Sequence, residues 1–100
     1  MIAVNTPKFQ LGKVVATPGA LAALEEAGQS PWVFLSLHLE GNWGTVDADD
    51  RAANDHALVE GSRILSAYRL NTGEKIWVIT EAEDDHGHRS ATTLLLPDEY

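Results

Sequence analysis

The chain of 100 residues contains no cysteine, which excludes disulfide bonds, thiolate metal sites and cysteine nucleophiles. It also has no continuous apolar run of the roughly eighteen residues that a membrane-spanning helix needs. The first eight residues have neither a basic segment nor a long apolar stretch, so we expect no secretory signal. Together these absences predict a cytoplasmic protein that does not enter a membrane.

Basic residues are scarce. Seven Lys and Arg face fifteen Asp and Glu, for a formal net charge of -8 at pH 7. Residues 47–100 hold twelve acids and five bases, which gives -7, and residues 1–46 contribute the remaining -1. Nucleic-acid binding depends largely on Lys and Arg that neutralise phosphates, so we expect no direct nucleic-acid binding. Such acidity suits a basic or nucleic-acid-binding protein partner, or it serves solubility alone.

Three apolar runs in the last forty residues predict strands. Residues 63–70, 75–81 and 90–96 are rich in β-branched and aromatic residues and are bounded by turn residues. The first two runs are joined by Asn71-Thr72-Gly73, which fits a type I turn closed by a bulge at glycine. A longer polar loop, Asp84 to His88, joins the second run to the third. The sequence therefore predicts an antiparallel meander.

Two helices before this meander have clear ends. Thr17 is a good N-cap, Pro18 suits the first helical position, and Gly28 suits the left-handed position that ends a helix. Asp47 caps a further helix that is expected to continue through about Glu60.

Residues 31–40 allow two interpretations. Leu35, Leu37 and Leu39 alternate with polar residues, as in a half-buried strand. The pair Ser30-Pro31 is typical of a helix start and Gly41 of a helix end, and these signals favour a helix.

The predicted fold is a single α+β domain over residues 9–100, with residues 1–8 flexible. Two or three short N-terminal helices would pack on a three- or four-stranded antiparallel C-terminal β-meander. Residues 9–16 would form either a strand at the sheet edge or an extended arm. The three tryptophans, which fall on a helix, a loop and a strand, fit a shared core: Trp32, Trp43 and Trp77.

Six motifs spread along the chain stand out together: Phe9-Gln-Leu-Gly, Ala16-Thr-Pro-Gly-Ala-Leu21, Asn42-Trp-Gly44, Ser66-Ala-Tyr68, Lys75-Ile-Trp-Val-Ile-Thr-Glu81 and Thr93-Leu-Leu-Leu-Pro-Asp-Glu-Tyr100. With these motifs the chain resembles a family of small bacterial proteins from plasmids and integrative elements, described as plasmid-related or as restriction-modification subunits. The resemblance runs from about Phe9 to the C-terminus. It implies no activity, so it assigns no role to any residue. A methyltransferase is not expected, because the chain lacks the Gly-rich strand-turn-helix of a nucleotide-cofactor fold.

The polar segment 81–89 contains side chains that can bind a divalent metal. His86 and His88 lie beside Asp84 and Asp85. All four come from one turn, however, and a solvated hairpin loop explains them better. The segment Asp47 to Asp50 lacks the glycine and the late glutamate of a calcium loop. We therefore predict no metal and no cofactor.

A small metal-independent ribonuclease of barnase-like or RelE-like architecture is the alternative function. Such an enzyme needs an acid–base pair and cations at the phosphate. Each candidate also has a structural explanation, such as an edge-strand charge, a core tyrosine with a solvated hydroxyl, or an exposed helix residue. The candidates are His56, Arg63, Tyr68, Arg89 and Thr92.

The leading hypothesis is a non-enzymatic, acidic interaction protein of a mobile genetic element. It would bind another protein, such as a host defence enzyme or a nucleic-acid enzyme, through acids on the last helix and the polar loop. A homodimer through an edge strand is a further expectation. The predicted binding residues are Asp47, Asp49, Asp50, Asp55, Glu81, Glu83, Asp84 and Asp85.

Overall fold

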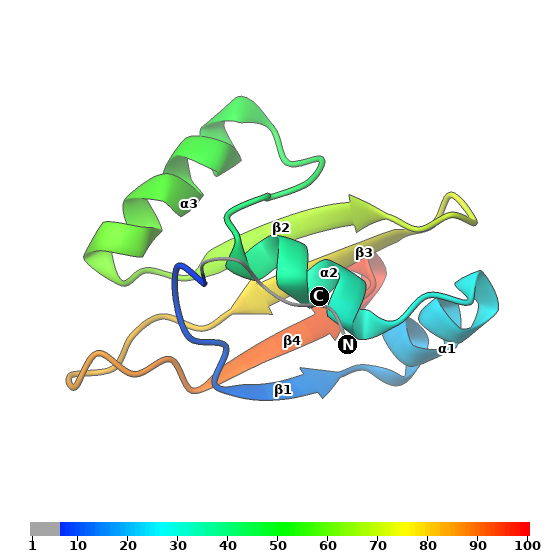
Figure 1. Cartoon of the computed structure of the whole chain (residues 1–100), viewed down its shortest axis with the longest axis horizontal. Coiled ribbons are helices and arrows are strands. Elements are labelled where there is room, and N and C mark those ends of the chain that lie inside the picture. The colour runs from blue at the N-terminus through cyan, green and yellow to red at the C-terminus, as the bar shows by residue number, and fades with distance from the viewer. Residues whose placement is uncertain (1–6) are drawn as a thin grey trace.

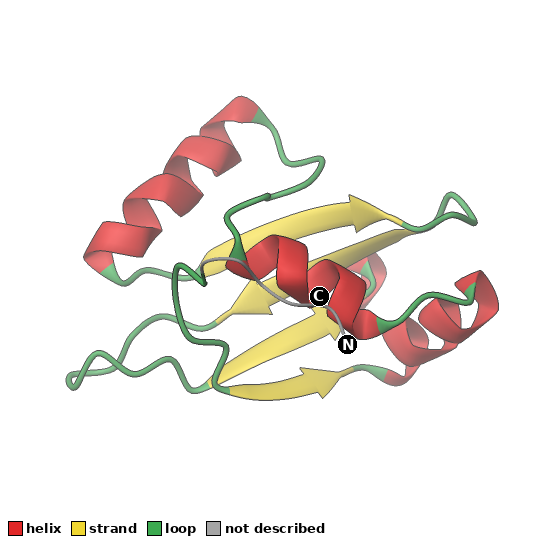
Figure 2. Ribbon diagram, viewed as in Figure 1, coloured by secondary structure: helices red, strands yellow, loops and turns green. Residues whose placement is uncertain are grey.

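The computed structural model describes residues 7–100, so the flexibility expected of residues 1–6 lies outside it. Four strands form one sheet with the order β1-β4-β3-β2, and three α-helices and a short 3-10 helix, η1, surround it (Figures 1 and 2). The elements are β1 (Lys13–Ala16), α1 (Pro18–Ala27), α2 (Pro31–Leu39), α3 (Ala48–Glu60), β2 (Ile64–Arg69), β3 (Lys75–Thr80), β4 (Ala91–Leu95) and η1 (Pro97–Glu99).

The helices begin and end where their capping residues predict. The Thr17 hydroxyl accepts a hydrogen bond from the N–H of Ala20, and Gly28 ends α1 with φ of 66°. Ser30 caps α2, which confirms the helical interpretation of residues 31–39. At α3, the Asp47 carboxylate accepts from the N–H of Asp50.

The three C-terminal strands form the expected antiparallel meander. Ser66 pairs with Val78 across β2 and β3, and Val78 pairs with Leu94 across β3 and β4. In the turn before β3, the N–H of Gly73 donates to the carbonyl of Leu70 over 2.9 Å, and Gly73 has φ of 93°. Glycine adopts this left-handed conformation without the steric penalty of other residues.

The prediction of an all-antiparallel sheet behind N-terminal helices is wrong in two respects. Strand β1 precedes the helices and joins the sheet parallel to β4, with Val14 beside Thr92 and Ala16 beside Leu94. The sheet is therefore mixed, and helical structure also follows it at η1. A parallel neighbour is possible because the helices and the other strands carry the chain back before β4 begins.

The main core lies between the sheet and the helices α1 and α2, which cover one of its faces (Figure 1). Leu24 and Leu35 from these helices pack with Val78 and Leu94 from the central strands, and all four are almost fully buried. A second cluster, which includes Trp43 and Ala57, joins α3 to the edge of the sheet at β2.

The tryptophans do not share one core, contrary to expectation. Trp43 is buried, Trp77 is half-buried, and Trp32 is 53% exposed in the first turn of α2. On the second face of the sheet, the ring of Trp77 packs against Tyr100 with 5.6 Å between ring centroids. The Arg63 guanidinium lies 5.6 Å from the centre of the Tyr100 ring.

The outer edge of β2 has its hydrogen bonds satisfied from outside the sheet. The Asn54 amide both accepts from the N–H of Leu65 (3.0 Å) and donates to its carbonyl (2.6 Å). Further along, Ala67 donates to the Trp43 carbonyl and accepts from the N–H of Thr45. Gly44 sits so close that a Cβ there would lie 1.9 Å from the Ala67 carbonyl oxygen. This edge is sealed against another strand.

Of the helices in the described part of the chain, not one combines the length and the apolar character that crossing a membrane requires.

Candidate functional site

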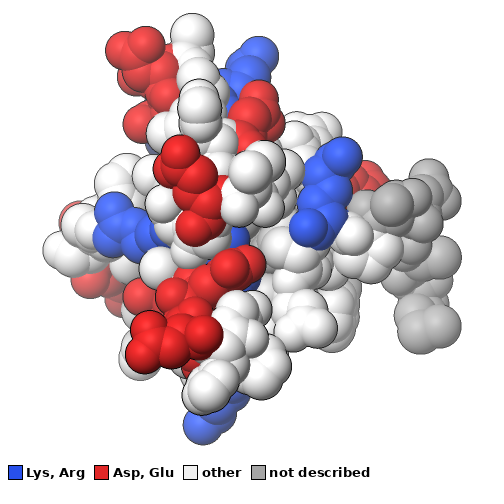
Figure 3. All heavy atoms as spheres, turned by 90° about the vertical axis from the view of Figure 1, so that its left-hand side faces the viewer, with Lys and Arg blue, Asp and Glu red and all other residues white. Residues whose placement is uncertain are grey.

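The acidic residues predicted to bind a partner are all exposed. Four lie at the start or along the outer side of α3, and four lie at the end of β3 or in the loop that follows it. Figure 3 views the side of the molecule on which α3 and the β3–β4 loop lie, and acidic side chains run down this side in a band. We call this band the acidic surface. Its residues are Asp47, Asp49, Asp50, Asp55, Glu81, Glu83, Asp84 and Asp85.

Two segments far apart in sequence meet within this surface. The N–H of Glu83 donates to the carbonyl of Gly61 over 2.7 Å, which places the β3–β4 loop against the C-terminal end of α3. The Glu83 carboxylate also lies so close to Gly61 that a Cβ on this glycine would approach it within 2.5 Å. The acids of the loop therefore lie against the C-terminal end of α3, whereas Asp47, Asp49 and Asp50 lie at the opposite end of this helix and Asp55 lies between them.

Arg89 is the residue that fixes this junction. Although charged, it is only 5% exposed, and its guanidinium donates to three backbone carbonyls. The acceptors are Ser62 (2.7 Å), Glu81 (2.9 Å) and Ala57 (3.1 Å), which belong to the link after α3, the end of β3, and the last turn of α3. The carbonyls at a helix C-terminus carry partial negative charge, which favours a cation there.

Burial lowers the pKa of Arg89 from its usual value, and the nearby Glu83 carboxylate partly raises it again. Arginine has so high an intrinsic pKa that the group stays cationic. The Phe9 ring lies 5.8 Å from the guanidinium carbon and completes its surroundings. The two segments that meet in the acidic surface are thus held together by one buried cation, Arg89.

The tip of the β3–β4 loop is held by its own hydrogen bonds. The Asp84 carboxylate accepts from the N–H groups of His86 (2.8 Å) and His88 (2.9 Å). These bonds lower the pKa of Asp84, with the bond from His88 contributing most. Within residues 7–100, no three His, Asp or Glu side chains gather as metal ligands would.

A chain of buried hydrogen bonds runs through the core beside α2. His38 has no exposed surface; its Nδ1 lies 2.5 Å from the Ser66 hydroxyl and its Nε2 lies 2.9 Å from the Thr80 hydroxyl. Thr80 and Thr92 are 2.7 Å apart, and the Thr92 hydroxyl donates to the carbonyl of Leu11. We call this series the His38 chain.

The Leu11 carbonyl, which is the last acceptor of the His38 chain, determines which group donates in each of the other hydrogen bonds. A carbonyl can only accept, so the Thr92 hydroxyl is used as its donor and accepts from Thr80. Thr80 in turn accepts from Nε2, which therefore carries the ring proton of His38, and Nδ1 accepts from Ser66. A neutral ring suits this arrangement. Burial, and secondarily the charge of Arg89, lower the pKa of His38 to about 3.

The His38 chain is positioned for structure rather than for chemistry on a substrate. The imidazole is enclosed by the rings of Phe9 (5.1 Å between centroids) and Trp43 (5.9 Å). Its bonds connect α2 to β2, β3 and β4, as expected for a hydrogen-bonded core histidine.

The residues of the alternative ribonuclease each have a separate partner. Thr92 belongs to the His38 chain and Arg89 to the carbonyl cluster, while the exposed His56 lies 3.9 Å from Glu60. Arg63 donates to the hydroxyl of Tyr100 over 2.5 Å. Tyr68, expected to have a solvated hydroxyl, is instead buried and donates to the carbonyl of Asn42. Burial raises the pKa of Tyr68 above its usual value.

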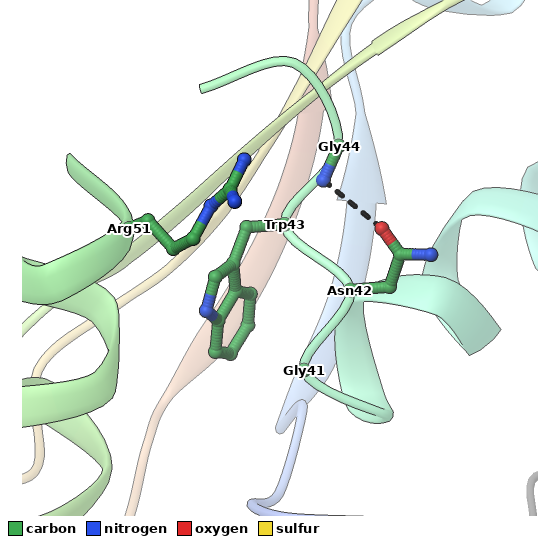
Figure 4. Close-up of a pocket in the computed structure, with 5 residues that line it drawn as sticks. All are labelled: Gly41, Asn42, Trp43, Gly44 and Arg51. Atoms are coloured by element: carbon green, nitrogen blue, oxygen red, sulfur yellow. Dashed lines mark hydrogen bonds between the residues drawn. The ribbon is translucent and has the colours of Figure 1, made fainter. Parts of the chain in front are cut away.

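A polar pocket of about 240 Å³ lies between α3 and the loop before it. Figure 4 shows Arg51 reaching from the helix toward the loop at Gly41–Gly44, where the Asn42 side chain accepts from the N–H of Gly44. Arg51 is the one titratable residue among those that line it, so the pocket provides no acid–base pair.

The sequence patterns do not predict an apolar surface that lies beside the edge strand β1. Val14 and Val15 of β1 and Leu21 and Trp32 of the neighbouring helices are exposed and line a groove of about 540 Å³. Trp32 directly follows Pro31, the first residue of α2. Because the first turn of a helix often faces solvent, this position was the signal in the sequence that Trp32 is exposed.

Comparisons of the chain with protein-family models, with curated proteins and with solved structures found no match.

Proposed function

We propose that this chain is a small acidic interaction protein that acts by binding a basic surface of another protein. The observation that carries the proposal is the acidic surface, a band of exposed carboxylates along α3 and the β3–β4 loop, two segments that are joined at Gly61 and Glu83 (Figure 3). Arg89 supports the proposal because it anchors both segments through backbone carbonyls and, within residues 7–100, donates no hydrogen bond to their carboxylates.

The partner that best fits this surface is a protein that itself binds nucleic acid. A groove that holds phosphates is lined with Lys and Arg, and carboxylates on a preformed surface can occupy it. Attraction between such surfaces speeds the encounter and weakens as salt rises. The resemblance to plasmid-related proteins remains a prediction, and it agrees with a role in which a mobile element acts on a host defence or nucleic-acid enzyme.

A capture experiment with matched charge variants tests the proposal. The immobilised protein is exposed to bacterial lysate at low and moderate salt, and bound proteins are identified. The test variant combines Glu81→Gln, Glu83→Gln and Asp85→Asn. The control combines Glu25→Gln, Glu26→Gln and Glu74→Gln, three exposed acids outside the acidic surface, and changes the net charge equally.

We expect a basic partner that the native protein and the control retain, that the test variant loses, and that moderate salt releases. Circular dichroism and thermal unfolding establish that both variants are folded. Equal capture by the two variants, or capture that ignores salt, would contradict the proposal.

A second proposal concerns self-association, the homodimer through an edge strand. Its support is separate from the acidic surface. With the order β1-β4-β3-β2, the two edges of the sheet are β1 and β2, and β2 is sealed by Asn54 and residues 43–45. The remaining edge, β1, is flanked by exposed apolar side chains.

A further inference from the structure

The exposed apolar side chains of this protein are concentrated around one strand. Six large hydrophobic residues of the described chain are exposed, and four of them adjoin β1: Val14 (40%), Val15 (37%), Leu21 (52%) and Trp32 (53%). They line the groove of about 540 Å³, whose lining residues are all apolar. Patches of this kind usually mark an interaction site.

The backbone of β1 offers hydrogen bonds on the same side. The N–H of Lys13 donates to Ser90 and that of Thr17 to Leu94, both toward β4. Because successive residues of a strand face alternate neighbours, the N–H and C=O groups of Val14 and Ala16 point away from the sheet. Within residues 7–100 no other segment pairs with this edge, which thus presents two residues ready for antiparallel pairing.

We propose that two copies of the chain pair antiparallel through β1, with a two-fold axis at Val15. This deepens the edge-strand homodimer proposed above. In this register Val14 of one copy lies opposite Ala16 of the second, and each such pair exchanges both of its N–H···O bonds. All outward groups of Val14 and Ala16 are then used, and the two sheets become one.

The charges beside β1 are complementary in this register. The Thr17 hydroxyl donates to the Glu99 carboxylate over 2.5 Å, so this carboxylate lies beside Thr17. Pairing about Val15 puts Lys13 of one copy opposite Thr17 of the second, and thus beside the second copy's Glu99. Within one copy, Lys13 is four residues from Thr17, about 13 Å along the strand. The paired copies therefore form two ion pairs that a single chain does not make.

The same register brings together the apolar side chains. Val15 meets Val15 of the second copy at a non-hydrogen-bonded position, where side chains approach most closely. Because α1 and α2 lie on one face of the sheet, the two-fold axis places both sets of helices on the same side, with Leu21 and Trp32 near the seam. The α3 part of the acidic surface adjoins the opposite edge of the sheet, at β2, so the α3 acids of the two copies stay apart.

The first experiment measures mass in solution by light scattering and sedimentation. We expect twice the 10.9 kDa of one chain. Val15→Lys, which sets like charges directly opposite each other, should give a monomer, while the control Val59→Lys, at an 88% exposed position on α3, should leave the dimer intact. Lys13→Glu should weaken dimerisation on the order of tenfold, because two attractions become repulsions.

The register has its own test, because the chain has no cysteine. In a non-hydrogen-bonded antiparallel pair, Cα atoms lie about 4.5 Å apart, within the range of a disulfide. Mild oxidation of Val15→Cys should therefore link two copies completely, and Val59→Cys should not react in this way.

A monomeric native protein would overturn both the homodimer and this register. A dimer that persists in Val15→Lys, or that Val15→Cys does not link, would overturn the register while the homodimer stands; neither result affects the acidic surface.

Discussion

His38 occupies a site where a neutral side chain is favoured and a charged one is penalised. Both ring nitrogens are already engaged, and the charge that acts on the ring is that of the cation Arg89, which disfavours a protonated imidazole. In the unfolded chain the ring returns to water and to its ordinary pKa of 6.5. Folding therefore removes a proton from His38 when the pH lies between about 3 and 6.5.

This difference predicts a loss of stability in mild acid. With a pKa of about 3 in the folded state, the contribution of His38 is fully present above pH 6.5 and is lost as the pH falls toward 3. The free energy of unfolding should fall by about 1.4 kcal/mol for each pH unit in this window from His38 alone. Denaturant unfolding from pH 7 to pH 4.5 measures it.

His38→Gln is the matched variant, since glutamine hydrogen-bonds but does not titrate. We expect it to be less stable than the native protein at pH 7 but to lose less stability on acidification. The carboxylates Asp84 and Glu99, whose pKa values are lowered, respond at lower pH and are common to both proteins. Equal slopes for the two proteins would show that His38 is not the group responsible.

At the scale of elements, Arg89 joins α3 to the end of β3. A lysine at this position retains the charge, but its compact ammonium group cannot reach three carbonyls in different directions as the guanidinium does. Leaving a buried charge and carbonyls unsatisfied should cost about 3 kcal/mol in Arg89→Lys. Chemical unfolding of this variant checks the value.

Arg69→Lys is the control for that measurement. Arg69 is exposed and donates to one carbonyl, that of Gly73, so the same chemical change should alter stability by less than about 0.5 kcal/mol. Hydrogen exchange should also show faster exchange in the last turn of α3 for Arg89→Lys alone. Similar losses in the two variants would mean that the carbonyl cluster does not anchor the helix.

The helix ends and the meander were predictable because their signals are local. Thr17, Pro18 and Gly28 lie within one helix, and Gly73 serves a turn of a few residues. The parallel pairing of β1 with β4 joins residues 13–16 to 91–94, and no local pattern records which distant strand a short segment will meet. A four-residue strand with mostly exposed side chains gives little periodicity to detect.

The candidate site, like the fold, was predictable from the sequence only in part. The exposure of the acids follows from their charge, which is costly to bury. Arg89, by contrast, stands in a polar loop and has the sequence context of a solvated residue. Its burial depends on carbonyls at the end of α3 and of β3, which come together only in the folded chain. Trp32 was assigned to a core shared by the three tryptophans because they fall on a helix, a loop and a strand, yet it is exposed at the helix start.

At the scale of the whole molecule, most negative side chains in the described part of the chain have no positively charged side chain at ion-pair distance. Between residues 7 and 100, the one contact of ion-pair distance between side chains is that of His56 with Glu60, at 3.9 Å. Mutual repulsion of exposed carboxylates destabilises a compact acidic chain, and salt screens it. We therefore expect the free energy of unfolding to rise when sodium chloride is increased from low to moderate concentration.

The variant Glu81→Gln, Glu83→Gln, Asp85→Asn should show a smaller rise with salt, because it removes three of the repelling charges. Thermal unfolding at neutral pH and at several salt concentrations makes the comparison. A stability that falls with salt would mean that attractive ion pairs outweigh repulsion.

The two edges of the sheet differ, and this difference limits how many molecules can join into one extended sheet. Residues 43–45 and Asn54 occupy the outward groups of Leu65 and Ala67, so no incoming chain can extend the sheet past β2. A protein with both margins open could add molecules without end and form fibres. Here assembly would stop at two molecules, and changes that free both Leu65 and Ala67 at the β2 edge, such as Asn54→Ala together with Gly44→Val, would turn a closed pair into a polymer.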